Sequence, residues 1–551
     1  MTDSRTGLAR RTLLKAGLAT AAAAVGAAGC DGSGSAGDAG DLADVSKGAM
    51  TDFKAGQPFT ATEDLTFTTY FPEWPEVPYR KDWMVWQELT KRTRVKLQAT
   101  VVPLSDYISK RSLQISAGDA PMLIPLTYVG EESSLTSSGA ILPVSDYVHL
   151  MPNFRARVEE YGLQADLDRM RQEDGRYYLL PGMFQDRNPD FTLTIRADKF
   201  EQAGIAVPQT WDEVRTALRG LKEKFPGVHP FSDNYQGNST LNFAAVSFGT
   251  RAGWGFGNGM VYDPAADKFV YGPSTSQHKD LVTYFNSLIA EGLMDPESYT
   301  QATELAERKF VTGKSLVTNG NSGNIPLWRR QMDQLLGPGK YKIAKIVQPA
   351  GPAGALMGGG RLWHGFMISA AARKNPNFVA MLQFIDWLCY DKSAKEFVKW
   401  GVEGVTYTKD AAGKRKLADG ISYLSLNPGA KKDLERDYGF ALNILQDGLT
   451  TDLERSMQSD EEVAFQKATL TTRKPVPESP PAPLSDAERE QVTLLTTPLK
   501  DTVDRRTLEF ILGRKPLTEW DAFQQELEAK GSKRYLDLVN TARQRYKDKH
   551  G

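Results

Sequence analysis

The chain has 551 residues, which is too long for one compact core, so we expect two or more domains. Apolar residues make up 40% and charged residues 25%, as in an ordinary globular protein, and the formal net charge is -1. The first 29 residues carry a net charge of +3, which leaves -4 for the rest of the chain. Nucleic acid is therefore excluded as an expected partner, because binding to phosphates needs a basic surface.

The first 30 residues have the features of an export signal. Arg10 and Arg11 are followed by apolar residues and a lysine, which resembles a twin-arginine signal and implies export in a folded state. The apolar run at 16–28 is too short and too rich in alanine for a stable membrane span. Cys30 follows it as the modified cysteine of a lipobox would, with Ala27 where a leucine is usual. We expect lipidation of Cys30; ordinary cleavage that releases the protein is the alternative.

A flexible tether is predicted over residues 31–58. Its first part is rich in Gly, Ser, Asp and Ala, which cannot form a core. The chain has 2 cysteines, so a lipidated Cys30 leaves Cys389 without a partner for a disulfide. Cys389 lies in an apolar helical run, and we expect a buried structural thiol there.

Strands and helices alternate in the next part of the chain. The apolar patterns predict strands at 65–70, 95–102 and 120–127, and helices at 80–93 and 105–117, the second capped by Ser105. This alternation predicts an α/β fold with a doubly wound sheet. Ligands of such sheets bind beyond the carboxyl ends of strands, so the loops at 70–76 and 127–131 are candidate cleft walls. Tyr70 and Trp74 in the first loop are candidates for stacking on a ligand.

Residues 177–213 are predicted to carry the chain from one lobe to another. A strand ends near Leu180, a polar loop spans 183–190, and a second strand spans 191–195. Thr210 and Glu213 have the spacing of a capping box, which predicts a helix from 211 to 225. Trp211 on that helix is expected in the core. The candidate binding residues in this segment all lie in its polar loop: Gln185, Arg187 and Asn188.

Two further segments resemble crossings between lobes. Residues 313–324 form a short strand and a polar turn, with the candidates Asn319 and Asn321. Residues 361–369 carry the candidates Arg361, Trp363 and His364, whereas a strand at 341–347 is assigned to the first lobe. Further candidates are Trp254, in a Gly-rich loop, and Tyr407. The remaining predicted elements are a hairpin at 262–271, helices at 277–291, 300–311 and 376–400, a Pro-rich connector at 474–483, and helices at 502–512, 519–530 and 532–546.

Several local patterns, taken in order, resemble one family. They are SAGDAP at 116–121, DGRYYLLP at 174–181, PQTWDE at 208–213, EGLMDPE at 291–297 and WGVEGVTY at 400–407. The chain is similar to the family 1 extracellular solute-binding proteins of ABC importers. Within that family it resembles the large sugar-binding lipoproteins, to which alginate-oligosaccharide-binding proteins belong; maltose-binding protein is another member of the family.

The resemblance implies a two-lobe periplasmic-binding-protein-like fold with hinge crossings and extra C-terminal helices. The expected division is 59–183 plus 315–358 for the first lobe, 184–314 plus 359–475 for the second, and 476–551 for the connector and last helices. The implied function is capture of a carbohydrate, an oligosaccharide, for delivery to ABC permease subunits. The protein is then an exported monomer without a cofactor, held at the outer face of the cell membrane by its lipid anchor.

The candidate residues suit sugars, because aromatic rings stack on pyranose faces and polar side chains bind hydroxyls. Arg251 and Arg361 are each able to pair with the carboxylate of a uronic acid, with ion pairs inside the protein as the alternative. Alginate-binding relatives carry a calcium loop where this chain reads FPGVHPF, at 225–231. That segment has no carboxylate cluster, so we expect no calcium there and no metal site.

Two other functions stay open from the residues alone. The five histidines are scattered without metal spacing, and no nucleophile motif of a hydrolase is present, so we do not predict an enzyme. Carboxylate pairs occur throughout the chain, however, and a secreted polysaccharide-active enzyme is one alternative. A binding protein for a non-sugar solute, such as a peptide, is the other, because a fold does not determine its ligand.

Overall fold

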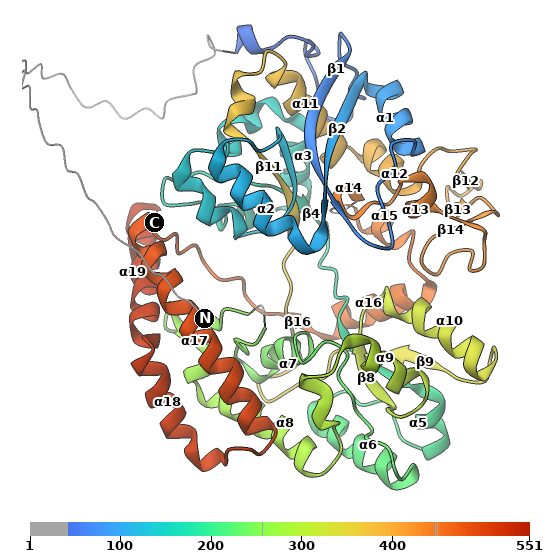
Figure 1. Ribbon diagram of the computed structural model, residues 1–551, viewed down its shortest axis with the longest axis vertical. Helices are drawn as coiled ribbons and strands as arrows, with labels where there is room; N and C mark the ends of the chain where they lie inside the picture. Colours follow the sequence, from blue (N-terminus) through green and yellow to red (C-terminus); the bar gives the residue numbers. More distant parts are fainter. Residues whose placement is uncertain (1–41, 256, 447, 449, 551) are drawn as a thin grey trace, which may run out of the picture.

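The computed structural model describes residues 42–550, except residues 256, 447 and 449. The expected export signal, Cys30 and the first part of the expected tether lie outside the described residues. The described chain forms two lobes, one above the other in Figure 1, with three C-terminal helices along one side. Each lobe has its own sheet and hydrophobic core, in agreement with the expected two-lobe α/β fold.

The sheet of the first lobe has five strands in the order β2-β1-β3-β11-β4. Its elements and connecting helices are β1 (Leu65–Glu73), α1 (Met84–Thr93), β2 (Val95–Pro103), α2 (Leu104–Ala117), β3 (Leu123–Thr127), β4 (Leu180–Met183) and β11 (Leu362–Ile368). Strand β1 is parallel to β2 and β3 because α1 and α2 carry the chain back between them. Strand β11 is antiparallel to both β3 and β4. Helix α2 begins one residue before the expected cap Ser105, which lies inside it.

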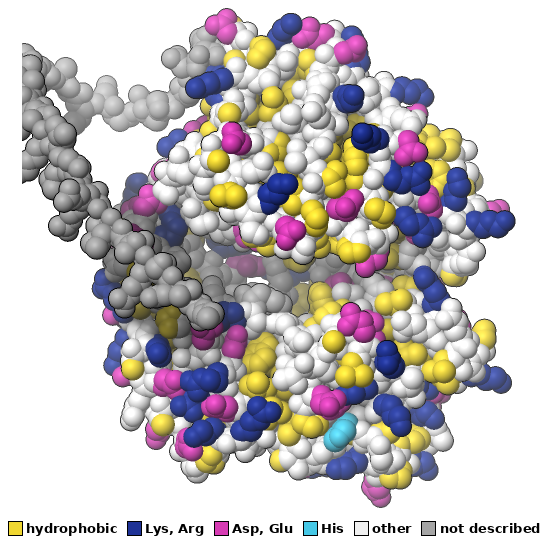
Figure 2. All heavy atoms as spheres, viewed as in Figure 1, with side chains coloured by type: hydrophobic (Ala, Val, Ile, Leu, Met, Phe, Trp, Pro, Cys, Tyr) yellow, Lys and Arg dark blue, Asp and Glu magenta, His cyan; other side chains and the backbone are white. Residues whose placement is uncertain are grey.

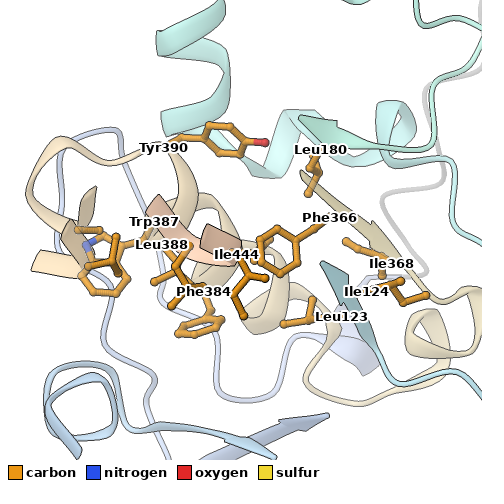
Figure 3. Close-up of a cluster of buried hydrophobic side chains, with 14 of the residues drawn as sticks. Leu123, Ile124, Leu180, Phe366, Ile368, Phe384, Trp387, Leu388, Tyr390 and Ile444 are labelled. Atoms are coloured by element: carbon orange, nitrogen blue, oxygen red, sulfur yellow. The ribbon is translucent and has the colours of Figure 1, made fainter. Parts of the chain in front are cut away.

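The core of the first lobe lies between this sheet and helix α11 (Phe378–Tyr390). Nearly every side chain of α11 is buried, and Figure 3 shows Phe384 and Leu388 gathered with Ile444 and Phe366. Cys389 on α11 is a free thiol whose pKa burial raises to about 11, so it stays protonated at neutral pH. The other elements of this lobe are α3 (Pro152–Tyr161), α4 (Gln164–Asp168), α12 (Lys392–Trp400), β12 (Tyr407–Lys409), β13 (Arg415–Leu417), β14 (Ile421–Ser422), β15 (Lys432–Asp433), α13 (Leu434–Tyr438), α14 (Asn443–Gln446) and α15 (Thr451–Arg455).

The second lobe is built on a three-stranded antiparallel sheet in the order β8-β5-β9. Its elements are β5 (Thr192–Arg196), α5 (Ala197–Ala203), α6 (Trp211–Lys224), α7 (Thr240–Phe248), β6 (Met260–Asp263), β7 (Lys268–Tyr271), α8 (Ser276–Ala290), α9 (Thr303–Val311), β8 (Val317–Gly320), α10 (Asn324–Leu336) and β9 (Ile343–Lys345). The Thr210 hydroxyl caps α6 by accepting from the amide of Glu213, as predicted. The Glu213 carboxylate accepts from the amide of Gln209 over 2.6 Å rather than from that of Thr210.

The last three helices complete the core of the second lobe. Helices α17 (Asp486–Ile511), α18 (Trp520–Ala529) and α19 (Ser532–His550) stand together along one side of the molecule in Figure 1. Helix α17 is much longer than the predicted 502–512, because Ser485 and Glu488 form a capping box before it. Its buried residues Val503 and Phe510 belong to the same hydrophobic cluster as Trp211 of α6.

The division into lobes differs from the expected one. Strands β8 and β9 flank β5 in the second lobe, so 315–358, including the strand expected in the first lobe, belongs to the second. Strand β11 lies between β3 and β4, so the chain after it, through α15, belongs to the first lobe. The expected tether is also too long, because Val45 is buried in the first core and the amide of Lys47 donates to Pro376.

Three segments of the described chain cross between the lobes: 184–191 between β4 and β5, 358–361 between β10 (Leu356–Met357) and β11, and 456–459 between α15 and α16 (Asp460–Thr472). The first lies where a crossing was predicted. The second meets the predicted crossing at 361–369 only at Arg361, because residues 362–368 form β11 inside the first-lobe sheet. The turn at 318–324 is not a crossing, because both β8 and α10 pack in the second lobe. The crossing at 456–459 was not predicted. Strand β16 (Lys474–Pro475) pairs with β10 beside the second crossing.

Candidate functional site

A cavity of about 1030 Å³ lies between the two lobes. Figure 2 shows the hollow that separates the upper and lower halves of the molecule. Its walls come from β11, α12, α14 and α15 of the first lobe, from α7, α9, α10 and α16 of the second, and from all three crossings. The volume is at the upper end of the roughly 300–1,000 Å³ range of small-molecule sites, so the cavity has room for a solute larger than a single sugar ring.

Each lobe presents a pair of aromatic rings to this cavity. In the first lobe, Trp363 is 45% exposed and packs edge-on against Phe184, with ring centres 6.5 Å apart. In the second lobe, Phe191 is 39% exposed and packs edge-on against Tyr235 at 5.8 Å. Exposed aromatic faces of this size are unusual in a protein interior and are typical of binding surfaces.

Amide side chains supply much of the polar lining. Asn188, Asn238, Asn242 and Gln348 line the cavity from the first crossing and the second lobe. On the side of the first lobe, the carbonyl oxygens of Asn443 and Gln458 are buried and have no hydrogen-bond partner among the described residues. An unsatisfied buried acceptor costs about 1–3 kcal/mol, but both oxygens are buried, so a hydroxyl in the open cavity does not reach them in this conformation.

Most charged groups on the wall are paired with one another. Lys345, which is 3% exposed, bonds Glu462 at 2.8 Å and Asp190 at 3.2 Å, and so joins β9, α16 and the first crossing. Burial raises the pKa of Glu462 while the charge of Lys345 lowers it. The other lining pairs are Lys399 with Glu454, at 2.8 Å, and Arg329 with Glu461.

Arg251 is the exception among the cations that line the described part of the cavity. No hydrogen bond or ion pair joins its guanidinium to another described residue. Burial lowers the pKa of Arg251, and the more distant charge of Glu478 raises it. The site therefore combines aromatic faces, amides, closed ion pairs and one open cation. Over the described residues there is no group of three or more His, Cys, Asp or Glu side chains placed to hold a metal ion.

Residues 82–402, more than half of the chain, match the family model for bacterial extracellular solute-binding proteins. The chain belongs to this family. Among curated proteins it is 22% identical over 530 residues to the fructooligosaccharide ABC transporter substrate-binding protein FusA of Streptococcus pneumoniae. The match covers 90% of this chain and 91% of FusA. This chain is 20% identical over 471 residues to the polygalacturonan/rhamnogalacturonan-binding protein YtcQ of Bacillus subtilis, covering 83% of this chain and 87% of that one.

Solved structures share the fold of this solute-binding protein. The crystal structure of the alginate-binding protein AlgQ2 without calcium ion matches with a TM-score of 0.68 at 19% identity, over 88% of this chain and 99% of that one. The structure of FusA from S. pneumoniae in complex with kestose matches with a TM-score of 0.61 at 21% identity, over 88% of this chain and 100% of FusA. In the part of this chain that the structure describes, no helix is long and apolar enough to cross a membrane.

Three of the residues predicted to bind the solute lie on the cavity wall, Asn188, Asn321 and Trp363, and so does Arg251, one of the two arginines proposed for a uronate. Asn188 accepts a hydrogen bond of 2.9 Å from Gln466 of α16, which fixes its amide at the first crossing. The Asn321 side-chain oxygen accepts from the amides of Gly323 and Asn324, and so caps the start of α10. Trp363 is held from behind by Tyr128, whose ring centre lies 5.6 Å away.

Three other predicted residues lie in or beside the crossings but bond to protein groups. Gln185 accepts from the amide of Thr451 at 3.0 Å. Arg187 pairs with Glu478 at 2.7 Å and donates to the carbonyl of Gly359. Arg361 pairs with Asp166 at 2.8 Å and donates to two carbonyls of the α3 end. The three side chains therefore join the crossings to neighbouring parts of the protein, and none of them lines the cavity.

The six remaining predicted residues also lie off the wall: Tyr70, Trp74, Trp254, Asn319, His364 and Tyr407. Tyr70 is 0% exposed and its hydroxyl donates to Gln114, because β1 is an interior strand, between β2 and β3. Tyr407 is buried and donates to Glu396, His364 is buried beside Tyr128, and Trp74 packs on the first core.

Trp254 and Asn319 support the wall from behind. The indole N–H of Trp254 donates to the carbonyl of Gln236 at 2.9 Å, and Gln236 lines the cavity. The amide of Asn319 donates to the hydroxyl of Ser239, another lining residue. Both side chains are buried, so their contribution is to position the loop before α7.

The sequence reading missed most of the second-lobe wall. The polar run DNYQGNST at 233–240 follows a buried Phe231 and precedes α7, which is the pattern of a ligand-facing loop. Phe184 and Phe191 bracket the polar loop of the first crossing, and their position was a usable signal. The contributions of α16 and of residues 423–425 had no such signal, because only tertiary packing brings them to the cavity.

Proposed function

We propose that this chain is an extracytoplasmic solute-binding lipoprotein that captures an oligosaccharide and delivers it to the permease subunits of an ABC transporter. The observation that carries the proposal is that one cavity has an exposed aromatic ring on each side, Trp363 packed against Phe184 and Phe191 packed against Tyr235. A pyranose ring stacks its apolar face on such rings, and amides around them bind its hydroxyls. The sugar ligands named for FusA and YtcQ support the same class of solute.

Capture follows from the placement of the rings on opposite lobes. A sugar that binds first to one lobe gains a second set of contacts only when the other lobe approaches. The closed state is therefore stabilised by its higher affinity for the solute, and the crossings act as the hinge. Asn188 in the first crossing and Asn321 in the turn before α10 are proposed to bind hydroxyls, and Trp363 to stack.

A panel titration tests the solute class. The purified protein is titrated calorimetrically with neutral and acidic oligosaccharides of two to six units, with monosaccharides and with short peptides, and each recovered ligand is analysed by mass spectrometry. Binding of an oligosaccharide, recovered intact and bound more tightly than its monosaccharide, is the expected result. Cleavage of the sugar would favour the enzyme alternative, and binding of peptides alone would favour the non-sugar alternative. Light scattering of the same sample is expected to give the mass of one chain.

Anchoring at the outer face of the cell membrane is proposed to depend on Cys30, which follows the twin-arginine-type signal. In cells that express the full chain, Cys30→Ser is expected to move the protein from the membrane fraction to the medium or the soluble exported fraction. Cys389→Ser is the matched control, because it removes the other cysteine and leaves the lipobox intact. Equal membrane association of both variants would contradict lipidation at Cys30.

A further inference from the structure

Arg251 lies where the second lobe meets the second crossing. It follows α7 and lines the cavity together with Val246 of that helix. The neighbouring crossing begins with three consecutive glycines, Gly358–Gly360, which also line the cavity, and ends at Arg361, which is bonded to Asp166. A methyl group added to Gly358 would come within 3.4 Å of Val246 and 3.8 Å of the Arg251 Nη1 atom. The guanidinium therefore lies beside bare backbone, and no side chain of the crossing covers it.

The surrounding charges leave Arg251 open to an anion. The charge of Glu478 raises the pKa of Arg251, but the Glu478 carboxylate is already bonded to Arg187 at 2.7 Å. Every carboxylate on the described wall of the cavity is bonded to a cation: Asp190 and Glu462 to Lys345, Glu454 to Lys399, and Glu461 to Arg329. Arg361, the other arginine considered for a uronate, is bonded to Asp166. Of the described cations on the wall, Arg251 alone has neither a hydrogen bond nor an ion pair with another described residue.

Arg251 is only partly buried and lines the cavity, so its guanidinium is accessible to a solute there. A carboxylate suits it better than a hydroxyl does, because two parallel charge-assisted hydrogen bonds match the fork of the guanidinium. The adjacent wall is apolar at Val246 and Phe243, which suits the ring that carries the carboxylate. We propose that Arg251 binds the carboxylate of a uronic acid residue, and that the solute is an acidic oligosaccharide. This inference rests on the proposed function as an oligosaccharide-binding protein.

Calorimetric titration of the purified full-length protein tests the assignment. The probes are oligosaccharides of galacturonate, mannuronate and guluronate, their methyl esters, and neutral oligosaccharides of the same lengths. At least one uronate oligomer is expected to bind, with an affinity that falls as salt is added. Its methyl ester is expected to bind about 10- to 100-fold more weakly, the ratio that follows from loss of a charged hydrogen bond.

Variants separate this site from general charge effects. Arg251→Gln is expected to weaken binding of the uronate oligomer by a similar factor and to leave the methyl ester unaffected, and Arg251→Lys to recover part of the loss. Arg330→Gln is the matched control, because Arg330 is exposed and does not line the cavity. Equal uronate binding by Arg251→Gln, or tighter binding of neutral sugars by the wild type, would overturn the inference and leave the proposed function standing. Failure of every saccharide to bind the folded wild type would overturn both.

Discussion

Replacement of Trp363 by alanine is expected to weaken solute binding while the protein stays folded. The ring is 45% exposed at the cavity wall, and only part of it packs against Tyr128 and Phe184. Trp211 provides the opposite case, because it is 1% exposed and stacks on Phe243 with ring centres 5.9 Å apart. Alanine at position 211 is therefore expected to lower stability.

The size of the effect follows from the exposed surface. A tryptophan side chain has roughly 150–250 Å² of surface to bury, so the exposed part of Trp363 is about 100 Å². Covering that area with a sugar ring is worth at most ~2.5 kcal/mol at about 25 cal/mol per Å², or about 60-fold in Kd. Since a sugar covers one face of the ring, we expect a loss of about 10- to 60-fold. Truncation of the buried Trp211 costs about 3–5 kcal/mol of unfolding free energy.

The assay pairs calorimetric titration with thermal unfolding for both variants. The ligand is the saccharide that binds most tightly in the panel above. Trp363→Phe serves as a control that keeps an aromatic face and is expected to lose less affinity than the alanine variant. The reasoning would be refuted if Trp363→Ala bound like the wild type while a folded Trp211→Ala lost most of its affinity.

Three further predictions concern stability and metal binding. Gly365→Ala would place a methyl carbon 1.9 Å from the Leu180 carbonyl oxygen. It is expected to separate β11 from β4 and to lower the free energy of unfolding by about 1–3 kcal/mol or more. Gly360→Ala is the control, because the nearest atoms to its methyl carbon are 3.9 Å away, and it is expected to leave the melting temperature unchanged. Burial raises the pKa of Glu132 to about 7, above its unfolded value, so the folded state binds more protons between about pH 4.3 and 7 and stability falls as pH rises through that window. The free energy of unfolding, measured with denaturant, is therefore expected to fall by about 3 kcal/mol between pH 4 and pH 8 in the wild type, and this fall is expected to be absent in Glu132→Gln. A fall of the same size in the variant would show that Glu132 is not its source. Calcium or a chelator is expected to leave the melting temperature unchanged, since the segment 225–231 has none of the carboxylates that calcium needs; tight one-to-one uptake in a titration would contradict this.

Local patterns predicted the elements themselves well. The alternation from β1 to β3 was readable because apolar side chains repeat with the period of a strand or of a helix within a few residues. Thr210 marked the start of α6 because a cap depends only on the next three residues. The start of α17 was not predicted, although Ser485 and Glu488 have the same spacing, because a Pro-rich segment directly before them resembles a connector.

The binding wall was harder to predict, because exposure depends on neighbours distant in sequence. Tyr70 and Trp363 are both aromatic strand residues, but Tyr70 lies inside β1 and is covered by Tyr107 and Gln114, whereas Trp363 near the start of β11 is 45% exposed. From the sequence, Arg361 and Arg251 are equal candidates for binding a uronate, and only the structure distinguishes them, because Asp166 pairs with Arg361. No pattern within a single segment contains that information.

The sequence by itself determined the class of this protein: an α/β chain of two lobes with the ordered motifs of a solute-binding family. These features depend on short-range periodicity and on composition, which a single chain displays directly. Only the tertiary structure decided which lobe holds 315–358 and which holds β11, because strand partners are chosen by packing across long separations. The same packing brings most charged groups on the cavity wall into ion pairs and leaves Trp363 and Arg251 facing the cavity. These two residues are therefore among those proposed to contact the solute.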